Sequence, residues 1–154
     1  MTTTKDRGRP RDWQYHVRVR LVRERVAAFG PALSCAGDIA ALMTPLLKDL
    51  DREQFWCLHL DAKNRLISRE MVSVGHLTAA LVHPREVFKA AILANAAAVA
   101  FAHNHPSGDP EPSREDIELT RRLVNAGELI GISVLDHVVI GGGRIVSLAE
   151  RGIA

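Results

Sequence analysis

A short buried strand runs directly into a loop rich in proline and glycine, and this junction constrains the fold more than any other segment. Residues 97–102 form an apolar run that is typical of a fully buried strand. Three prolines and one glycine fall within residues 103–112, so the strand must end there in a loop. Ser113 then starts a predicted helix that runs to about Ala126. This order of elements favours an α/β (α+β) domain.

The rest of the chain supplies further strands and helices for such a domain. Asp38 is expected to cap one helix, and Pro84 stands at the first position of another. Residues 16–21 alternate between apolar and polar side chains, which indicates a short strand or the lead into a helix. The pattern as a whole predicts helices packed on a mixed sheet. The predicted strands are 55–60, 66–74, 133–140 and 144–147, and the predicted helices are 38–48 and 84–95.

Composition limits the number of domains and the compartment. With 154 residues, 47% of them hydrophobic, the chain is long enough for one ordinary core and too short for two. Its two cysteines, Cys35 and Cys57, are too few for a disulfide framework or a cysteine-rich zinc site. We find no signal peptide, and the longest apolar run, residues 90–102, is shorter than the ~20 residues that cross a membrane. We therefore expect a cytoplasmic protein without membrane contact.

Positive charge is concentrated near the N-terminus. Residues 1–25 hold eight basic and three acidic residues, although the net charge of the whole chain is only +2. Such an arm is either a solvated tail or a surface for weak contact with nucleic acid. We divide the chain into a basic N-terminal arm with a lead-in segment, residues 1–36, and one folded domain, residues 37–154.

Two histidines lie at the end of the buried strand. His103 and His105 are two residues apart, so the period-2 geometry of a strand places both imidazoles on one side of the chain. Asp116 falls at the third position of the following helix and shares an inward face with Leu119 and Leu123. A carboxylate on such a face is costly unless it is paired or bound to a metal. The three polar side chains together predict a zinc site that leaves a fourth tetrahedral position for water.

Each of these features also has an ordinary structural explanation. Ser113 and Asp116 alone form a common helix start, and an acid there suits the helix dipole. A His-x-His pair alone is a weak signal. The metal-site hypothesis depends on all of them meeting across one strand, loop and helix.

Zinc-dependent hydrolysis also requires a base that takes a proton from water and returns it to the leaving group. Glu70 is the first candidate, because an alternating strand places it on one face with Val72 and Val74. Apolar neighbours raise the pKa of a carboxyl group, which suits acid–base work. The alternative is that Glu70 is an ordinary surface residue of an edge strand. Glu86 is the competing candidate for the base, but its place near a helix start gives it a capping role.

These residues resemble a known family. His103-x-His105, seven residues, and then Ser113-x-x-Asp116 match the JAMM (MPN+) metalloprotease motif, with a glutamate upstream. The resemblance covers roughly residues 37–150, and it implies a JAB/MPN fold similar to cytidine deaminases, with helices around a curved mixed sheet. Three longer strings resemble the RadC family in particular, namely residues 81–88, 103–110 and 135–141.

The resemblance implies a zinc-dependent metallopeptidase or isopeptidase that acts on a protein or peptide. Zn²⁺ would be bound by His103, His105 and Asp116. Glu70 would match the catalytic glutamate of the family, and Ser113 would hydrogen-bond the oxyanion. Two other functions stay open. One is a RadC-type module associated with nucleic acid in DNA repair or mobile elements, and the other is a non-catalytic scaffold that zinc only stabilises.

Several residues of these RadC-like strings have no catalytic role in this interpretation. His83 and Arg85 are expected to bracket the start of a helix. Asp136 and His137 are expected either to support the metal ligands from behind or to be buried polar partners of other groups.

Overall fold

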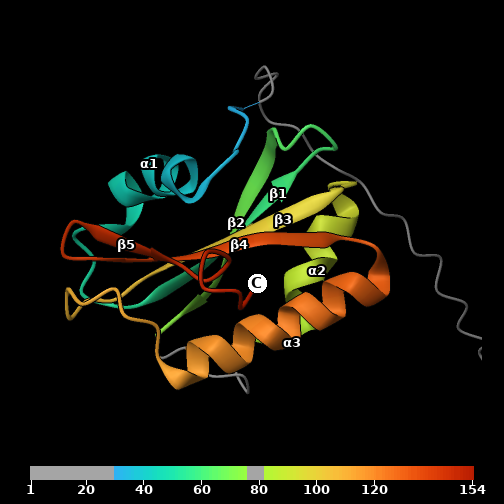
Figure 1. Ribbon diagram of the computed structural model, residues 1–154. Coiled ribbons are helices and arrows are strands. Elements are labelled where there is room, and N and C mark those ends of the chain that lie inside the picture. The colour runs from blue at the N-terminus through green and yellow to red at the C-terminus, as the bar shows by residue number, and fades with distance from the viewer. Residues whose placement is uncertain (1–29, 76–81) are drawn as a thin grey trace, which may run out of the picture.

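One mixed sheet organises the computed structural model, which describes residues 30–75 and 82–154 (Figure 1). Its strands lie in the order β2-β1-β3-β4-β5. The neighbours β3 and β4 are parallel, and every other pair is antiparallel. The predicted α+β class with a mixed sheet is therefore confirmed. In chain order the elements are α1 (Ala36–Leu47), β1 (Gln54–Leu60), β2 (Leu66–Val74), α2 (Pro84–Leu93), β3 (Ala98–Asn104), α3 (Arg114–Ile130), β4 (Ser133–Gly141) and β5 (Arg144–Ser147).

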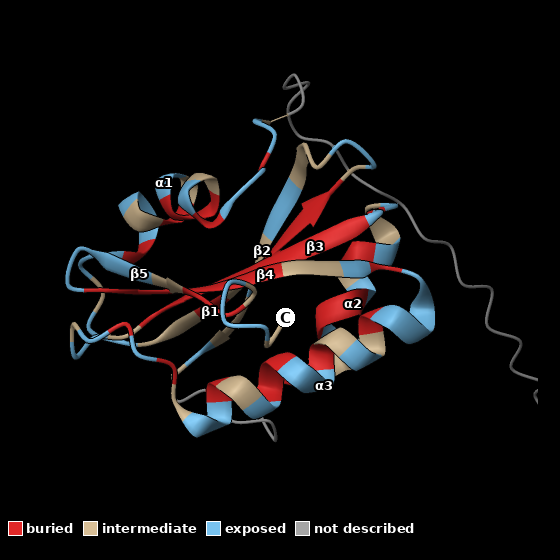
Figure 2. Ribbon diagram, in the orientation of Figure 1, coloured by how far each residue is buried: buried red, intermediate tan, exposed pale blue. Residues whose placement is uncertain are grey.

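Helices cover both faces of the sheet. Helix α1 packs on one face, and helices α2 and α3 pack on the other (Figures 1 and 2). Strand β3 lies in the middle of the sheet, and all seven of its residues are buried. This double coverage explains why its sequence is a continuous apolar run rather than an alternating one. The core on the side of α2 and α3 includes Phe55, Phe101, Leu119 and Leu123, and the core on the side of α1 includes Leu33, Ile39, Met43 and Ile140.

Two helix ends differ from their predicted positions. Asp38 does not cap α1 but lies at its third position, where its carboxylate accepts from the backbone N–H groups of Ser34 (2.7 Å) and Cys35 (3.2 Å). Cys35 is the capping residue, so the helix begins earlier than expected. Helix α3 runs to Ile130 because its first strong stop signal is Gly131, which adopts a left-handed conformation with φ of 76°.

The lead-in segment pairs with the β1–β2 hairpin. Ala32 forms an isolated antiparallel bridge with Arg65, and the Gly30 N–H donates to the Leu66 carbonyl at 3.0 Å. Leu33 is buried in the core below α1. The alternating segment 16–21 and the basic residues of the arm lie outside the described residues.

Helices α1, α2 and α3 are each too short or too polar to cross a lipid bilayer.

A buried histidine in β1 makes the stability of the fold depend on pH. His59 is 2% exposed, its Nδ1 lies 2.8 Å from Ser68 Oγ, and its Nε2 has no hydrogen-bond partner among the described residues. Burial lowers the pKa of His59 from 6.5 to about 4. The unfolded chain therefore takes up a proton below pH 6.5 that the folded protein does not accept until the pH reaches about 4. The contribution of His59 to stability is therefore fully present above this window and is lost as the pH drops through it.

We expect this histidine to cost about 2.5 kcal/mol of unfolding free energy when the pH falls from about 7.5 to about 4.5. Urea unfolding of the parent and of His59→Gln at both pH values measures the difference. Glutamine can also hydrogen-bond Ser68 but does not titrate, so the variant should lose less stability than the parent. Equal losses in the two proteins would contradict this assignment.

Candidate metal centre

Four side chains of the types that bind metals meet where β3 ends. One ligand atom from each of Glu53, His103, His105 and Asp116 can be chosen so that all four lie within 4.8 Å of one another. The Nε2 atoms of the two histidines are 3.0 Å apart. Asp116 approaches them at 3.4 Å through Oδ1 and 3.3 Å through Oδ2. Glu53 Oε1 lies 3.6 Å from both nitrogens. The structure thus brings together the three expected ligands and a carboxylate that we did not predict.

The end of β3 and the loop after it position the two histidines. His103 is the sixth residue of β3 and is fully buried. His105 follows the strand, and its backbone N–H donates to the Ile140 carbonyl of β4 at 2.8 Å. Its Nδ1 lies 2.8 Å from the Asp109 carbonyl, which can only accept. His105 Nδ1 therefore carries the proton, and Nε2 is the nitrogen that faces the cluster.

The first turn of α3 holds Asp116 rigidly. Asp116 is 1% exposed, and its Oδ2 accepts from the backbone N–H and the hydroxyl of Ser113, both at 2.7 Å. The Ser113 Oγ in turn accepts from the Asp116 N–H at 3.0 Å, which completes a capping box. Burial alone would raise the pKa of Asp116, but its contacts with His103, His105 and Ser113 hold it well below the usual range. Asp116 is therefore an ionised carboxylate.

Asn104 fixes the loop that carries Glu53. Its side chain accepts from the Gln54 N–H at 2.8 Å and donates to the Arg52 carbonyl at 3.0 Å, so it clamps the backbone on both sides of Glu53. Phe55 pairs with His103 in the antiparallel register of β1 and β3, and continuing this register places residue 53 opposite residue 105. Pairing of β1 with β3 is the signal that points to Glu53, and the linear sequence does not display it.

Glu70 lies away from the cluster. It pairs with Cys57, which pairs with Phe101 on β3, so Glu70 lies two residues along the strands from the level of His103 and on a more distant strand. Burial raises the pKa of Glu70, in the expected direction, and the charges that act on it come from Lys89 and Glu86. Glu86 also lies outside the cluster and forms an ion pair with Lys89 at 2.6 Å. The structure brings neither expected base to the cluster, and it brings Glu53 instead.

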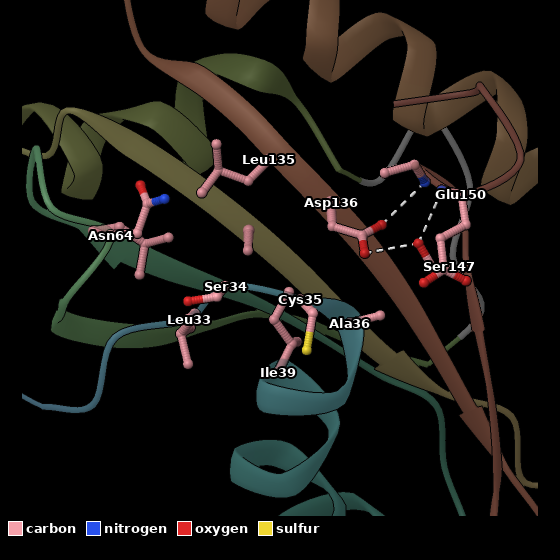
Figure 3. A pocket seen from close by; sticks show the side chains of 13 residues that line it. Leu33, Ser34, Cys35, Ala36, Ile39, Asn64, Leu135, Asp136, Ser147 and Glu150 are labelled. Carbon is pink, nitrogen blue, oxygen red and sulfur yellow. Dashed lines mark hydrogen bonds between the residues drawn. The ribbon is translucent and has the colours of Figure 1, made fainter.

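The other residues of the RadC-like strings have structural partners. His83 caps α2, and its Nδ1 accepts from the Arg85 N–H at 3.1 Å, as expected. Asp136 points to the face of the sheet that lies away from the cluster, into a cavity of about 370 Å³ below α1 (Figure 3). There it accepts from Ser147 Oγ at 2.7 Å and from the Ala149 N–H at 3.0 Å. Asp136 is thus a buried partner that ties β4 to β5 and the C-terminal segment.

The donor set and its spacing fit a small divalent cation. A tetrahedral zinc ion with bonds of about 2.0–2.2 Å keeps its ligand atoms about 3.3–3.6 Å apart. The two distances from Asp116 to the histidine nitrogens, 3.4 and 3.3 Å, fall in that range, and the two Nε2 atoms lie slightly closer together, at 3.0 Å. The carboxylates also attract positive charge, because Asp116 in the first place, and Glu53 to a smaller extent, raise the pKa of His105 although burial opposes this. Nitrogen and oxygen ligands of this kind suit zinc.

A glycine turn after β4 supports the loop that follows His105. Gly142 has a φ of 55°, and a Cβ atom there would lie only 2.5 Å from the Gly108 carbonyl oxygen. Gly143 also has a left-handed φ, 76°, but a Cβ atom there would meet no heavy atom within 4 Å. A substitution at Gly143 therefore introduces backbone strain alone. A substitution at Gly142 adds a steric clash with the loop that orients His105.

We expect Gly142→Ala to weaken binding of a divalent cation at the cluster and Gly143→Ala to leave that binding close to that of the parent. Gly143→Ala should cost about 1–2 kcal/mol in unfolding free energy, because alanine disfavours a left-handed backbone, and Gly142→Ala should cost more, because the clash with the Gly108 carbonyl adds to the same strain. Only the first moves Gly108 and with it the Asp109 carbonyl that holds His105. Competition with a chelator measures the affinities, and equal values for the two variants would contradict this role of the turn.

Comparison with known proteins shows which family the chain resembles. A family model described as "RadC-like JAB domain" matches residues 33–153. A UPF0758 protein of Methanosarcina acetivorans is 54% identical over 115 residues, which are 75% of this chain and 50% of that protein. A UPF0758 protein of Symbiobacterium thermophilum is 60% identical over 111 residues, 72% of this chain and 47% of that protein. The chain therefore spans about half the length of these curated relatives, whose names state no activity.

Proposed function

Because the chain belongs to the RadC-like JAB domain family and joins two histidines to two carboxylates at one point, we propose that it is a zinc-dependent hydrolase of amide bonds. His103, His105 and Asp116 would hold the ion, and Glu53 would act as the general base and acid. The substrate class that suits this chemistry is a peptide or an isopeptide. The role that the sequence suggested for Glu70 passes to Glu53 in this proposal.

Zinc in such a site acts as a Lewis acid that lowers the pKa of water to about 7 and polarises a carbonyl group. Glu53 removes one proton from the attacking water, whose oxygen forms the new bond to the amide carbon. Glu53 then returns that proton to the amide nitrogen as the carbon–nitrogen bond breaks. The products are a carboxylic acid and an amine, and no oxidant or further reactant is needed.

We assign Asp116 as a ligand and Glu53 as the base because the surroundings of the two carboxylates differ. Asp116 is 1% exposed and is held by two hydrogen bonds from Ser113, which suits a fixed ligand. Glu53 is 17% exposed in its side chain, and its only short polar side-chain contacts among the described residues are those to the two histidines. Its carboxylate is thus free to turn toward water and substrate, while Asn104 clamps the backbone on both sides of it.

Ser113 can assist the reaction only after a change of partner. Its single hydroxyl proton goes to Asp116 Oδ2, and its oxygen accepts from the Asp116 N–H. To donate to an oxyanion, the hydroxyl must release Asp116 Oδ2 while it keeps its capping bond. We propose that the hydroxyl changes partner in this way, since the backbone N–H of Ser113 continues to hold Asp116.

The test is hydrolysis by the purified, zinc-loaded protein of a mixed library of fluorogenic peptides and isopeptide-linked peptides. We expect cleavage that a chelator stops and that added zinc restores. Zinc bound at one ion per chain without cleavage of any member would contradict the hydrolase and favour a scaffold that zinc stabilises. Absence of zinc binding after reloading would contradict the metal centre itself.

A further inference from the structure

A line of buried polar side chains runs from His103 into the core behind the metal centre. His103 Nδ1 lies 2.7 Å from His137 Nε2. His137 Nδ1 lies 2.6 Å from Thr120 Oγ1, and the Thr120 hydroxyl lies 2.6 Å from the backbone carbonyl of Asp116. His103, His137 and Thr120 are each 0% exposed. The line therefore begins at one expected ligand, His103, and ends on the backbone of another, Asp116.

The chemistry of the groups gives every proton in this line one place. A carbonyl oxygen only accepts, so the single hydroxyl proton of Thr120 goes to Asp116. Thr120 Oγ1 must then accept from His137 Nδ1, which carries a proton. A neutral imidazole has one N–H, so His137 Nε2 is an acceptor and receives the Nδ1 proton of His103. His103 Nε2 is left with its lone pair directed at the cluster.

Aromatic side chains hold the middle ring of this line in place. The ring of Phe55 lies 5.3 Å from that of His137 at 87°, and the ring of Phe101 lies 6.0 Å from it at 86°. Both contacts have the edge-to-face geometry that aromatic rings prefer. Rotation of the His137 ring would break both the packing and two buried hydrogen bonds.

We infer that Thr120 and His137 are positioning residues, which fix the tautomer and orientation of His103 and couple it to the helix turn that carries Asp116. This inference rests on the metal centre of the proposed function and extends it to side chains that touch no metal. Partners behind a ligating histidine commonly set which nitrogen faces the metal, and their loss typically costs 10–100-fold in metal affinity.

Two substitutions at one position test the inference with nearly constant shape. Thr120→Val replaces the hydroxyl with a methyl group, so His137 Nδ1 loses its acceptor and the opposite tautomer of His137 becomes favourable. That tautomer would place a proton on His103 Nε2, where the ion should bind. Thr120→Ser keeps the hydroxyl. We expect Zn²⁺ affinity, measured by chelator competition, to fall about 10–100-fold in Thr120→Val and to stay near the parent value in Thr120→Ser.

The ¹⁵N spectrum of the metal-free parent gives a second readout that needs neither zinc nor activity. We expect His103 to carry its proton on Nδ1 in the parent and in Thr120→Ser, and to lose this preference in Thr120→Val. A parent in which His103 is protonated on Nε2 alone would overturn the inference, as would equal zinc affinities in both variants. Failure of the parent to bind zinc would instead contradict the proposed function. The tautomer of His103, which is measured in the metal-free protein, would still test the positioning roles of Thr120 and His137.

Discussion

Replacing Glu53 with glutamine should reduce amide hydrolysis by about 10²- to 10⁴-fold, the usual contribution of a general acid–base residue, and should leave bound zinc in place. Glutamine has nearly the shape of glutamate but cannot take a proton from water. The three other side chains of the cluster, His103, His105 and Asp116, remain to hold the ion. Steady-state kinetics on the zinc-loaded variant, with the zinc content measured on the same sample, separates the two effects.

Glu70→Gln is the matched control for this experiment. Glu70 is also a partly buried carboxyl group, and burial raises its pKa, but it pairs with Cys57 on β1 and lies outside the cluster. We expect activity within a few-fold of the parent. The opposite result, with Glu70→Gln inactive and Glu53→Gln active, would return the role to the residue that the sequence suggested. Loss of zinc from Glu53→Gln would make Glu53 a fourth ligand.

Replacing His105 with alanine should abolish both zinc binding and the stabilisation that zinc gives to the fold. A ligand that binds only the folded state at 100 times its Kd raises the unfolding free energy by about 2.7 kcal/mol. The parent should show a gain of this order on zinc addition, and His105→Ala should show none. Thermal unfolding with and without zinc provides the measurement.

His83→Ala is the control for the loss of a histidine. It removes the side chain that caps α2, which costs about 1 kcal/mol. Because His83 lies outside the metal cluster, this variant should still gain stability from zinc. Zinc stabilisation that persists in His105→Ala would show that the ion binds elsewhere on the chain.

The features that the sequence predicted well depend on residues close together along the chain. Period-2 geometry places His103 and His105 on one side of β3, and the Ser113–Asp116 capping box turns a carboxylate into the core. Strands β1 and β2 are consecutive in the chain and are joined by a short turn, and β3 is a continuous apolar run. Each of these signals is local, so one sequence is enough to detect it.

The features that escaped prediction depend on contacts between distant segments. Glu53 reaches the cluster because β1 pairs with β3, and Phe55 and His103 are far apart in the sequence. The link from His103 to His137 and Thr120 depends on how β4 and α3 pack against β3. Glu70 has the burial expected of a catalytic acid but lies on the wrong part of the sheet for contact with the ligands. Burial alone therefore does not place a carboxylate beside the cluster.

The most direct measurement is a crystal structure of the zinc-loaded protein with anomalous scattering recorded at the zinc edge. We predict one ion bound by His103 Nε2, His105 Nε2 and Asp116, with Glu53 near the open position and not bonded to the ion. An ion held by all four side chains would contradict the catalytic account and indicate a closed structural site. An anomalous peak elsewhere on the chain, with none at this cluster, would contradict the metal centre.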